Sequence, residues 1–197
     1  MTTSLDIPRL NDFVSAFSAL LDTSPDEARI VAEGGALLQA LVSHDDWLPD
    51  SHAQPNPARY SQYLLYADAQ ERFSVVSFVW GPGQATPIHN HTVWGLIGML
   101  RGAEVSQPYA RTANALDAPW VADGAAITLH PGDVEAVSPR LGDVHRVHNA
   151  LDAQTSISIH VYGADIGKVK REVYFADGSS KLFISGYSEP VSTADTH

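Results

Sequence analysis

The sequence predicts an all-β barrel preceded by an α-helical segment, together forming a single domain over residues 1–197. Two observations predict this fold class. Apolar residues follow a helical period within residues 1–45, and short β-branched and aromatic runs alternate with turns within residues 60–187. Many short strands at close spacing are typical of β-barrels and β-sandwiches. Residues 188–197 are small and polar, and we expect them to form a flexible tail.

Two amphipathic helices are expected within the N-terminal segment. In the first, apolar residues form one stripe at intervals of three and four: Leu10, Phe13, Val14, Phe17, Leu20 and Leu21. Asn11 is the candidate N-cap of this helix. The second helix is expected to start at Ser24-Pro25-Asp26-Glu27, with Ser24 as N-cap and Glu27 in the capping-box position. Gly34-Gly35 either weakens this helix or lets another element pack closely against it.

Short strands are expected in the rest of the chain. The clearest candidates are residues 73–80, 93–100, 126–129, 144–147 and 157–162. Glycine and proline mark turns between them at residues 81–83, 131–133 and 177–178. Residues 45–58 are rich in Pro, Asp, His and Ser, and are expected to form the loop that joins the helices to the barrel.

The composition excludes several classes of function. The formal net charge is −11 and no Lys/Arg cluster is present, which disfavours nucleic-acid binding. The chain has no cysteine, so disulfides, thiolate metal sites and cysteine nucleophiles are excluded. The start of the chain lacks a secretory signal pattern, and no apolar run is long enough to span a bilayer. A cytoplasmic protein without a membrane partner is therefore expected, and a homo-oligomer is left open.

His89 and His91 form an H-x-H pattern just before the apolar run at residues 93–100. Side chains at positions i and i+2 of a strand point to the same face, so both imidazoles would point at one interior site. Neutral imidazole binds iron, zinc, copper or nickel. An isolated H-x-H is also common on polar surfaces, so the prediction depends on a third histidine from another strand.

A second motif supplies that histidine. Residues 142–149 (GDVHRVHN) resemble the ending of the second metal motif of the cupins, with His145 as the third ligand. His148 would point to the opposite face of the strand. In the first motif, Gly95 stands where cupins usually carry a glutamate ligand. The resemblance implies an all-β cupin (jelly-roll-like) barrel whose metal is held by three neutral histidines.

A site of three neutral histidines leaves open positions on a divalent metal. Such a site suits hydrolytic zinc or oxygen-activating iron, whereas a structural zinc site would be closed by a fourth protein ligand. The histidines in loop-like or terminal contexts are expected to be solvated: His44, His52, His130 and His197.

Ser158, His160 and Tyr162 occupy alternate positions of one expected strand. All three would therefore point to the same face, and inside a barrel they would have to hydrogen-bond one another. A Ser–His–Tyr chain would place the Tyr162 hydroxyl as a positioned donor near the metal. The alternative is an edge strand whose polar side chains face water.

Taken together, these motifs resemble the thiol dioxygenase branch of the cupins, which includes cysteine dioxygenase and bacterial 3-mercaptopropionate dioxygenase. The similarity runs from about Tyr60 to Tyr162 and includes H-R-V-x-N at residues 145–149. The resemblance implies Fe(2+), dioxygen, and oxidation of a thiol to a sulfinic acid that retains both oxygen atoms.

Two departures from cysteine dioxygenase bear on the substrate. Many cysteine dioxygenases carry a Cys cross-linked to the active-site Tyr, but this chain has no Cys, so Tyr162 is unmodified. The family's Y-x-R segment, whose Arg pairs with the cysteine carboxylate, is here Tyr60-Ser61-Gln62. Gln62 cannot form the charged bidentate pair of an Arg. Gln62 and the HTVWGLIGMLRG sequence at residues 91–102 resemble the 3-mercaptopropionate dioxygenases.

The substrate carboxylate then needs another cation. Arg171, near Lys168 and Lys170, is the candidate; the alternative is a solvated basic turn. The predicted function is therefore iron-dependent oxidation of a small thiol carboxylate, with 3-mercaptopropionate as the expected substrate. Cysteine, mercaptosuccinate and cysteamine remain alternatives, as do a zinc cupin hydrolase or isomerase and a non-catalytic cupin that binds a small acid.

Overall fold

The structure, a computed structural model, describes residues 5–112 and 118–191. Its helical elements are α1 (Pro8–Asp22), α2 (Glu27–Arg29), the π-helix η1 (Ile30–Gly34), α3 (Gly35–Val42) and the 3₁₀ helix η2 (Asp50–His52). Its strands are β1 (Ser61–Ala67), β2 (Ser74–Trp80), β3 (Ile88–His89), β4 (Gly95–Arg101), β5 (Glu104–Arg111), β6 (Trp120–Ala122), β7 (Ile127–Leu129), β8 (Val134–Val137), β9 (His145–Asn149), β10 (Ser156–Tyr162), β11 (Arg171–Tyr174) and β12 (Ser180–Phe183).

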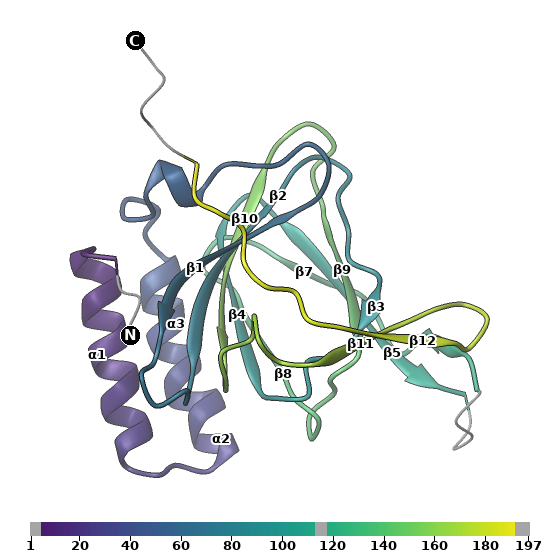
Figure 1. The fold of residues 1–197 in the computed structure, drawn as a ribbon, viewed down its shortest axis with the longest axis horizontal. Coiled ribbons are helices and arrows are strands. Elements are labelled where there is room, and N and C mark those ends of the chain that lie inside the picture. The colour runs from purple at the N-terminus through teal and green to yellow at the C-terminus, as the bar shows by residue number, and fades with distance from the viewer. Residues whose placement is uncertain (1–4, 113–117, 192–197) are drawn as a thin grey trace.

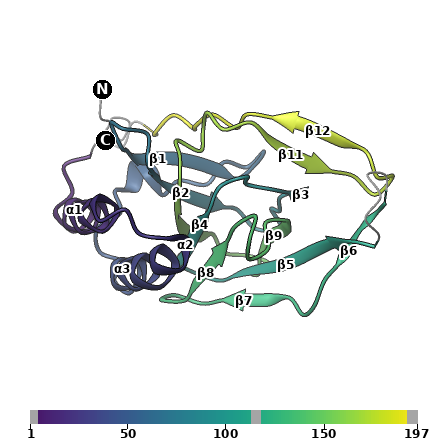
Figure 2. The ribbon, with the colours of Figure 1, turned by 90° about the horizontal axis from the view of Figure 1, so that it is seen from below.

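Two antiparallel sheets form the barrel. One has the order β1-β2-β10-β4-β8, and the other has the order β12-β11-β3-β9-β5-β6, with β7 paired to β5. The first sheet lies between the helices and the second sheet (Figure 1), and the β11–β12 hairpin and the β5–β7 region lie on opposite sides of the barrel (Figure 2). The predicted all-β cupin barrel with an N-terminal helical segment is confirmed, and each of the five expected strands is present.

The helices cover the outer face of the first sheet. Phe17 of α1 and Leu38 of α3 join one core cluster with strand residues such as Leu65 and Ile159. A Cβ on Gly34 would lie 2.8 Å from the Phe17 ring, so this glycine allows close packing between helices, one of the two expected roles of the Gly34-Gly35 pair. Gly98 plays the same part in β4, where a Cβ would lie 2.8 Å from Leu38.

The expected helix caps are wrong. α1 begins at Pro8 after Ile7 without a side-chain cap, so Asn11 lies inside the helix. Ser24 has a φ of +51° and its N–H donates to the carbonyl of Leu21, so it ends the first helix and does not start the second. The N-cap of the second helix is Asp26, whose side chain accepts the N–H of Arg29 at 2.9 Å.

The expected loop at residues 45–58 is more ordered than its composition suggests, and residues 188–191 are the part of the expected tail that the structure describes. Within residues 45–58, His52 is only 5% exposed and its carbonyl accepts the hydroxyl of Ser77 at 3.0 Å, so the expectation that it is solvated is wrong. His44 and His130 are exposed, as expected, and His197 lies outside the described residues. In the tail, the Ser188 N–H donates to the Gln62 carbonyl at 2.7 Å. Residues 192–197 lie outside the described residues. Among the helices of the described ranges, none is both long and apolar enough to span a bilayer.

Replacing Gly98 with alanine tests the contact between helix and sheet. The new methyl group would overlap Leu38 and approach Val42 Cγ1 to 3.0 Å. We expect Gly98→Ala to lower the free energy of unfolding by about 1–3 kcal/mol, measured by urea denaturation. Gly35→Ala is the control, since nothing lies within 4 Å of its Cβ position and alanine should stabilise that helix by roughly 0.5–1 kcal/mol. Equal stability of the two variants would contradict the packing.

Candidate active site

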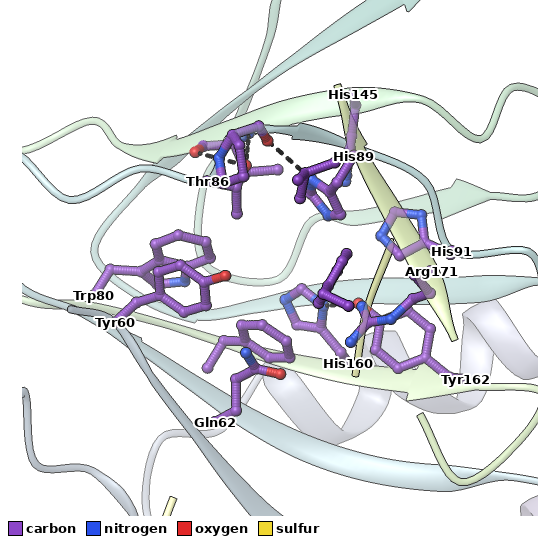
Figure 3. Close-up of a pocket in the computed structure, with 15 residues that line it drawn as sticks. Tyr60, Gln62, Trp80, Thr86, His89, His91, His145, His160, Tyr162 and Arg171 are labelled. Carbon is purple, nitrogen blue, oxygen red and sulfur yellow. Dashed lines mark hydrogen bonds between the residues drawn. The ribbon is translucent and has the colours of Figure 1, made fainter. Parts of the chain in front are cut away.

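Three histidines meet at one end of a buried cavity. His89 lies on β3, directly across from His145 on β9, and His91 follows β3 by two residues. All three are buried, and their ligand atoms lie within 4.8 Å of one another. The ring centroids are 4.8–4.9 Å apart, and Figure 3 shows the imidazoles gathered above Tyr162 and His160.

His91 is not held in the way the sequence predicts. β3 ends at His89, so the two histidines do not share a regular strand. Asp143 positions His91 instead: its Oδ1 accepts the His91 backbone N–H at 2.9 Å, and its Oδ2 accepts the Thr92 N–H at 2.9 Å. The same carboxylate lies 3.1 Å from His91 Nδ1. Both imidazoles still point to one site, as expected.

Acceptors fix the tautomers of His89 and His91. The Nδ1 of His89 lies 3.1 Å from the Pro87 carbonyl, and the Nδ1 of His91 faces the Asp143 carboxylate. Carbonyl and carboxylate oxygens can only accept, so each Nδ1 carries its hydrogen. The Nε2 lone pairs are therefore free to bind a metal.

His145 also has a free Nε2, but its tautomer is set through two side chains, Ser106 and Glu135. Ser106 Oγ donates to Glu135 Oε1 at 3.0 Å and lies 3.1 Å from His145 Nδ1. Because the single hydroxyl hydrogen goes to Glu135, Ser106 accepts from His145 Nδ1, and Nε2 is again the free nitrogen.

The electrostatics favour neutral ligands. Burial, followed by the proximity of His91, lowers the pKa of His89 to about 3, and burial lowers the pKa of His145 well below its ordinary value. Three neutral imidazoles at this spacing fit a divalent transition metal. No carboxylate joins the histidine cluster among the described residues. A Cβ on Gly95 would lie 2.8 Å from the Tyr162 ring, so the usual cupin glutamate would collide with this tyrosine.

The Ser–His–Tyr row forms the opposite wall. β10 lies between β2 and β4 and all of its residues are buried, so the alternative of a water-facing edge strand is wrong. Ser158 Oγ lies 2.8 Å from His160 Nε2, and His160 Nδ1 lies 2.8 Å from the Tyr162 hydroxyl. Burial raises the pKa of Tyr162, which keeps the phenol protonated. The Tyr162 ring stacks 5.5 Å from the His91 ring.

Arg171 and Gln62 complete a cavity of about 200 Å³. Arg171 is 3% exposed, so the alternative of a solvated basic turn is wrong for this residue. Its Nη2 donates to Ser185 Oγ at 2.7 Å, its guanidinium lies 4.7 Å from the Phe183 ring centroid, and its Nε has no hydrogen-bond partner. Gln62 Oε1 is also buried without a partner. Both side chains point into the cavity (Figure 3).

Sequence reasoning missed much of the cavity wall. The Phe78 ring stacks 4.0 Å from the His160 ring, and Trp80 Nε1 donates to Ser158 Oγ at 3.4 Å. Tyr60 stacks on Trp80 at 4.6 Å. The alternation of Phe78 and Trp80 places both rings on one face of β2 and could have indicated this aromatic wall. β2 pairs with β10 and aligns Phe78 with Ser158. Nothing in the sequence pattern pointed to Ser106.

Removing Asp143 tests how the metal ligands are held. Asp143→Ala deletes the acceptor that orients His91, and we expect metal affinity to fall by roughly ten- to a hundredfold. The measurement is competition with a chelator of known affinity. Asp152→Ala is the control, since Asp152 is exposed and lies seven residues beyond His145. An unchanged affinity in Asp143→Ala would show that His91 needs no such support.

Comparison with known proteins agrees with this geometry. A family model described as cysteine dioxygenase type I matches residues 28–172. Similar solved structures include a conserved protein with a double-stranded β-helix domain from Klebsiella pneumoniae (17% identity, 68% of this chain and 91% of that chain, TM-score 0.45). Another is a cupin 2 domain-containing protein from Halorhodospira halophila (15% identity, 67% and 79%, TM-score 0.47). These structural likenesses are partial, whereas the family match spans most of the chain. The chain belongs to the cysteine dioxygenase type I family, whose members are metal-dependent thiol dioxygenases.

Proposed function

We propose that this protein uses Fe(2+) and dioxygen to convert 3-mercaptopropionate into the corresponding sulfinic acid. One observation carries the proposal. A single buried cavity is lined by three histidines with free Nε2 atoms, by the Tyr162 phenol, and by the guanidinium of Arg171. A thiol carboxylate has one group for each end of such a cavity.

His89, His91 and His145 would hold the iron through their Nε2 atoms. Bound ferrous iron would supply a site where the substrate sulfur binds as thiolate beside dioxygen, with the electrons for oxidation coming from the sulfur. The histidines are neutral, so they leave the charge of the metal uncompensated and favour an anionic sulfur ligand.

Arg171 would bind the substrate carboxylate. No ion pair in the described part of the chain involves this side chain, and burial lowers its pKa, which reflects the cost of keeping its charge away from water. A carboxylate would accept from the unpaired Nε and offset that cost. Ser185 and Phe183 hold the guanidinium in place, and Gln62 offers a second, neutral contact to the carbon chain or carboxylate.

Tyr162 would donate a hydrogen bond to the reacting atoms as negative charge builds up on them. His160, bonded to Ser158, holds the phenol oxygen in place. The aromatic rings of Tyr60, Phe78 and Trp80 line the cavity and exclude water from it.

The lining also favours 3-mercaptopropionate over the other thiols. No aspartate or glutamate lines the cavity among the described residues, so the ammonium group of cysteine has no anionic partner and would face Arg171. The second carboxylate of mercaptosuccinate would need a second cation, and Arg171 is the only cation in the described lining. Cysteamine has no carboxylate for Arg171 to bind.

An oxygen-electrode assay of the iron-loaded enzyme tests the proposal. We expect kcat/KM to be highest for 3-mercaptopropionate within a panel that also contains cysteine, mercaptosuccinate and cysteamine. Tyr162→Phe should lower turnover and keep its iron. If metal analysis of protein produced without added metal found zinc, and no thiol caused oxygen uptake, the protein would instead be a hydrolytic cupin. If thiols raised the melting temperature but were not turned over, it would be a binding protein.

Replacing Arg171 with methionine tests the carboxylate contact. Arg171→Met keeps an apolar stem over Phe183 and removes the charge. We expect kcat/KM for 3-mercaptopropionate to fall by roughly ten- to a hundredfold, because hydrogen bonds to charged groups contribute about 1.5–3 kcal/mol. The rate with cysteamine should not fall. Lys170→Met is the matched control, because Lys170 is exposed. An unchanged KM for 3-mercaptopropionate in Arg171→Met would exclude Arg171 as the carboxylate partner.

A further inference from the structure

Glu104 is a buried carboxyl group that the proposed mechanism does not use. It lies at the start of β5 and is 0% exposed. Its Oε1 accepts the hydroxyl of Ser156 at 3.2 Å, whereas its Oε2 is buried and makes no hydrogen bond of standard geometry. No ion pair involves Glu104 in the described residues. An unpaired buried carboxylate is costly, so the neutral acid is favoured.

Glu104 lies at the far end of the Ser–His–Tyr row. Ser156, which donates to Glu104 Oε1, and Ser158 are alternate residues of the buried strand β10, so the Ser158 hydroxyl lies on the same face as the Glu104 carboxyl group. Ser158 in turn contacts His160 Nε2, and His160 Nδ1 contacts the Tyr162 hydroxyl. A row of polar groups therefore runs from Glu104, behind the cavity wall, to the phenol inside the cavity, and the contact between Glu104 and Ser158 is the step that the proposal supplies.

The hydrogen bonds along Ser158, His160 and Tyr162 can all be donated in either of two directions. Neutral His160 donates from one ring nitrogen and accepts at the other. If Ser158 donates to Nε2, then Nδ1–H donates to the Tyr162 oxygen, and the phenol hydrogen is free to point into the cavity. If Ser158 accepts from Nε2–H, then Nδ1 accepts the phenol hydrogen and Tyr162 has none to give.

We propose that Glu104 is a positioning residue that sets this direction. As a neutral acid, its hydroxyl donates to Ser158, Ser158 donates to His160, and the phenol hydrogen of Tyr162 is left for the reacting atoms. As a carboxylate, Glu104 can only accept, so it takes the Ser158 hydrogen and reverses the chain. This inference rests on the proposed function in one respect: in that reaction, the Tyr162 hydroxyl donates its hydrogen to the reacting atoms.

The surroundings of Glu104 support this switch. Burial raises the pKa of Glu104 to about 8, although the hydroxyls of Ser158 and Ser156 favour its charged form, and the charge of Glu135 on β8 raises it further. Among the neighbouring titratable groups, burial also raises the pKa of Glu135. Burial lowers the pKa of His145 on β9 and of His160 on β10, and raises the pKa of Tyr162. Glu104 therefore ionises as the pH rises through about 8.

Glu104→Gln locks the chain in the active direction. Ser156 donates to Oε1 in the native protein, so the amide oxygen of glutamine should keep that contact and the amide N–H₂ should replace Oε2. The variant then has a permanent donor and no charge, and it should fold as the wild type does at neutral pH, where Glu104 is also neutral.

The direct test is nitrogen NMR of labelled histidine in the zinc-substituted enzyme, with the His160 signals assigned by their loss in His160→Gln. In the wild type, hydrogen should sit on Nδ1 of His160 below about pH 8 and on Nε2 above it. In Glu104→Gln it should stay on Nδ1 throughout. The same tautomer in both proteins at every pH would overturn the inference, whether or not the enzyme oxidises thiols.

Turnover gives a second readout. The wild-type rate with iron and 3-mercaptopropionate should fall as the pH rises through about 8, and this fall should be absent from Glu104→Gln. Glu189→Gln, which changes an exposed carboxyl group, should keep the wild-type profile. An identical alkaline fall in Glu104→Gln would contradict the switch. A tautomer change without thiol-dependent oxygen uptake would support the switch and reject the proposed function.

Discussion

The site depends on strand β10 being buried on both faces. Ile157, Ile159 and Val161 belong to the core beneath the helices, and the alternate residues face the barrel interior. Polar groups cut off from water must hydrogen-bond one another, so Ser158, His160 and Tyr162 form a fixed chain. This chain holds the phenol at one side of the cavity. The three histidines proposed as metal ligands come from β3, β9 and the segment after β3 on the other side (Figure 3).

Local charge, rather than net charge, supports the proposed substrate. The chain carries a net charge of −11, yet its cavity contains a buried guanidinium and no acidic lining residue among those described. Two carboxyl groups lie behind the histidines and outside the cavity lining: Asp143 contacts His91 directly, and Glu135 contacts His145 through Ser106. The carboxylate of a small thiol carboxylate would complement this guanidinium, and its thiolate would complement the metal that the histidines are proposed to hold.

Strand alternation predicted the Ser–His–Tyr row, because it fixes which side chains share a face. The resemblance to the cupin motifs supplied His145, and His89 and His91 do lie together although β3 ends at His89. Neither could predict what supports these side chains. Asp143 and Ser106 contact the histidines from other segments of the chain. Arg171 is buried by Phe183, its partner across the β11–β12 hairpin, and by Ser185 just beyond that hairpin. These contacts join residues whose spacing has no period. The prediction that Ser24 caps the second helix was wrong because its backbone N–H donates to Leu21 at the end of the preceding helix.

The central proposal is that the cavity oxidises a thiol carboxylate with dioxygen at a site of three neutral histidines. The most direct measurement is mass spectrometry of the product formed by the iron-loaded enzyme from 3-mercaptopropionate under isotopically heavy dioxygen. The account predicts a sulfinic acid in which both new oxygen atoms are heavy, with one dioxygen consumed for each product molecule. A product that carries oxygen from water, or oxygen uptake without a sulfinic acid, would contradict it.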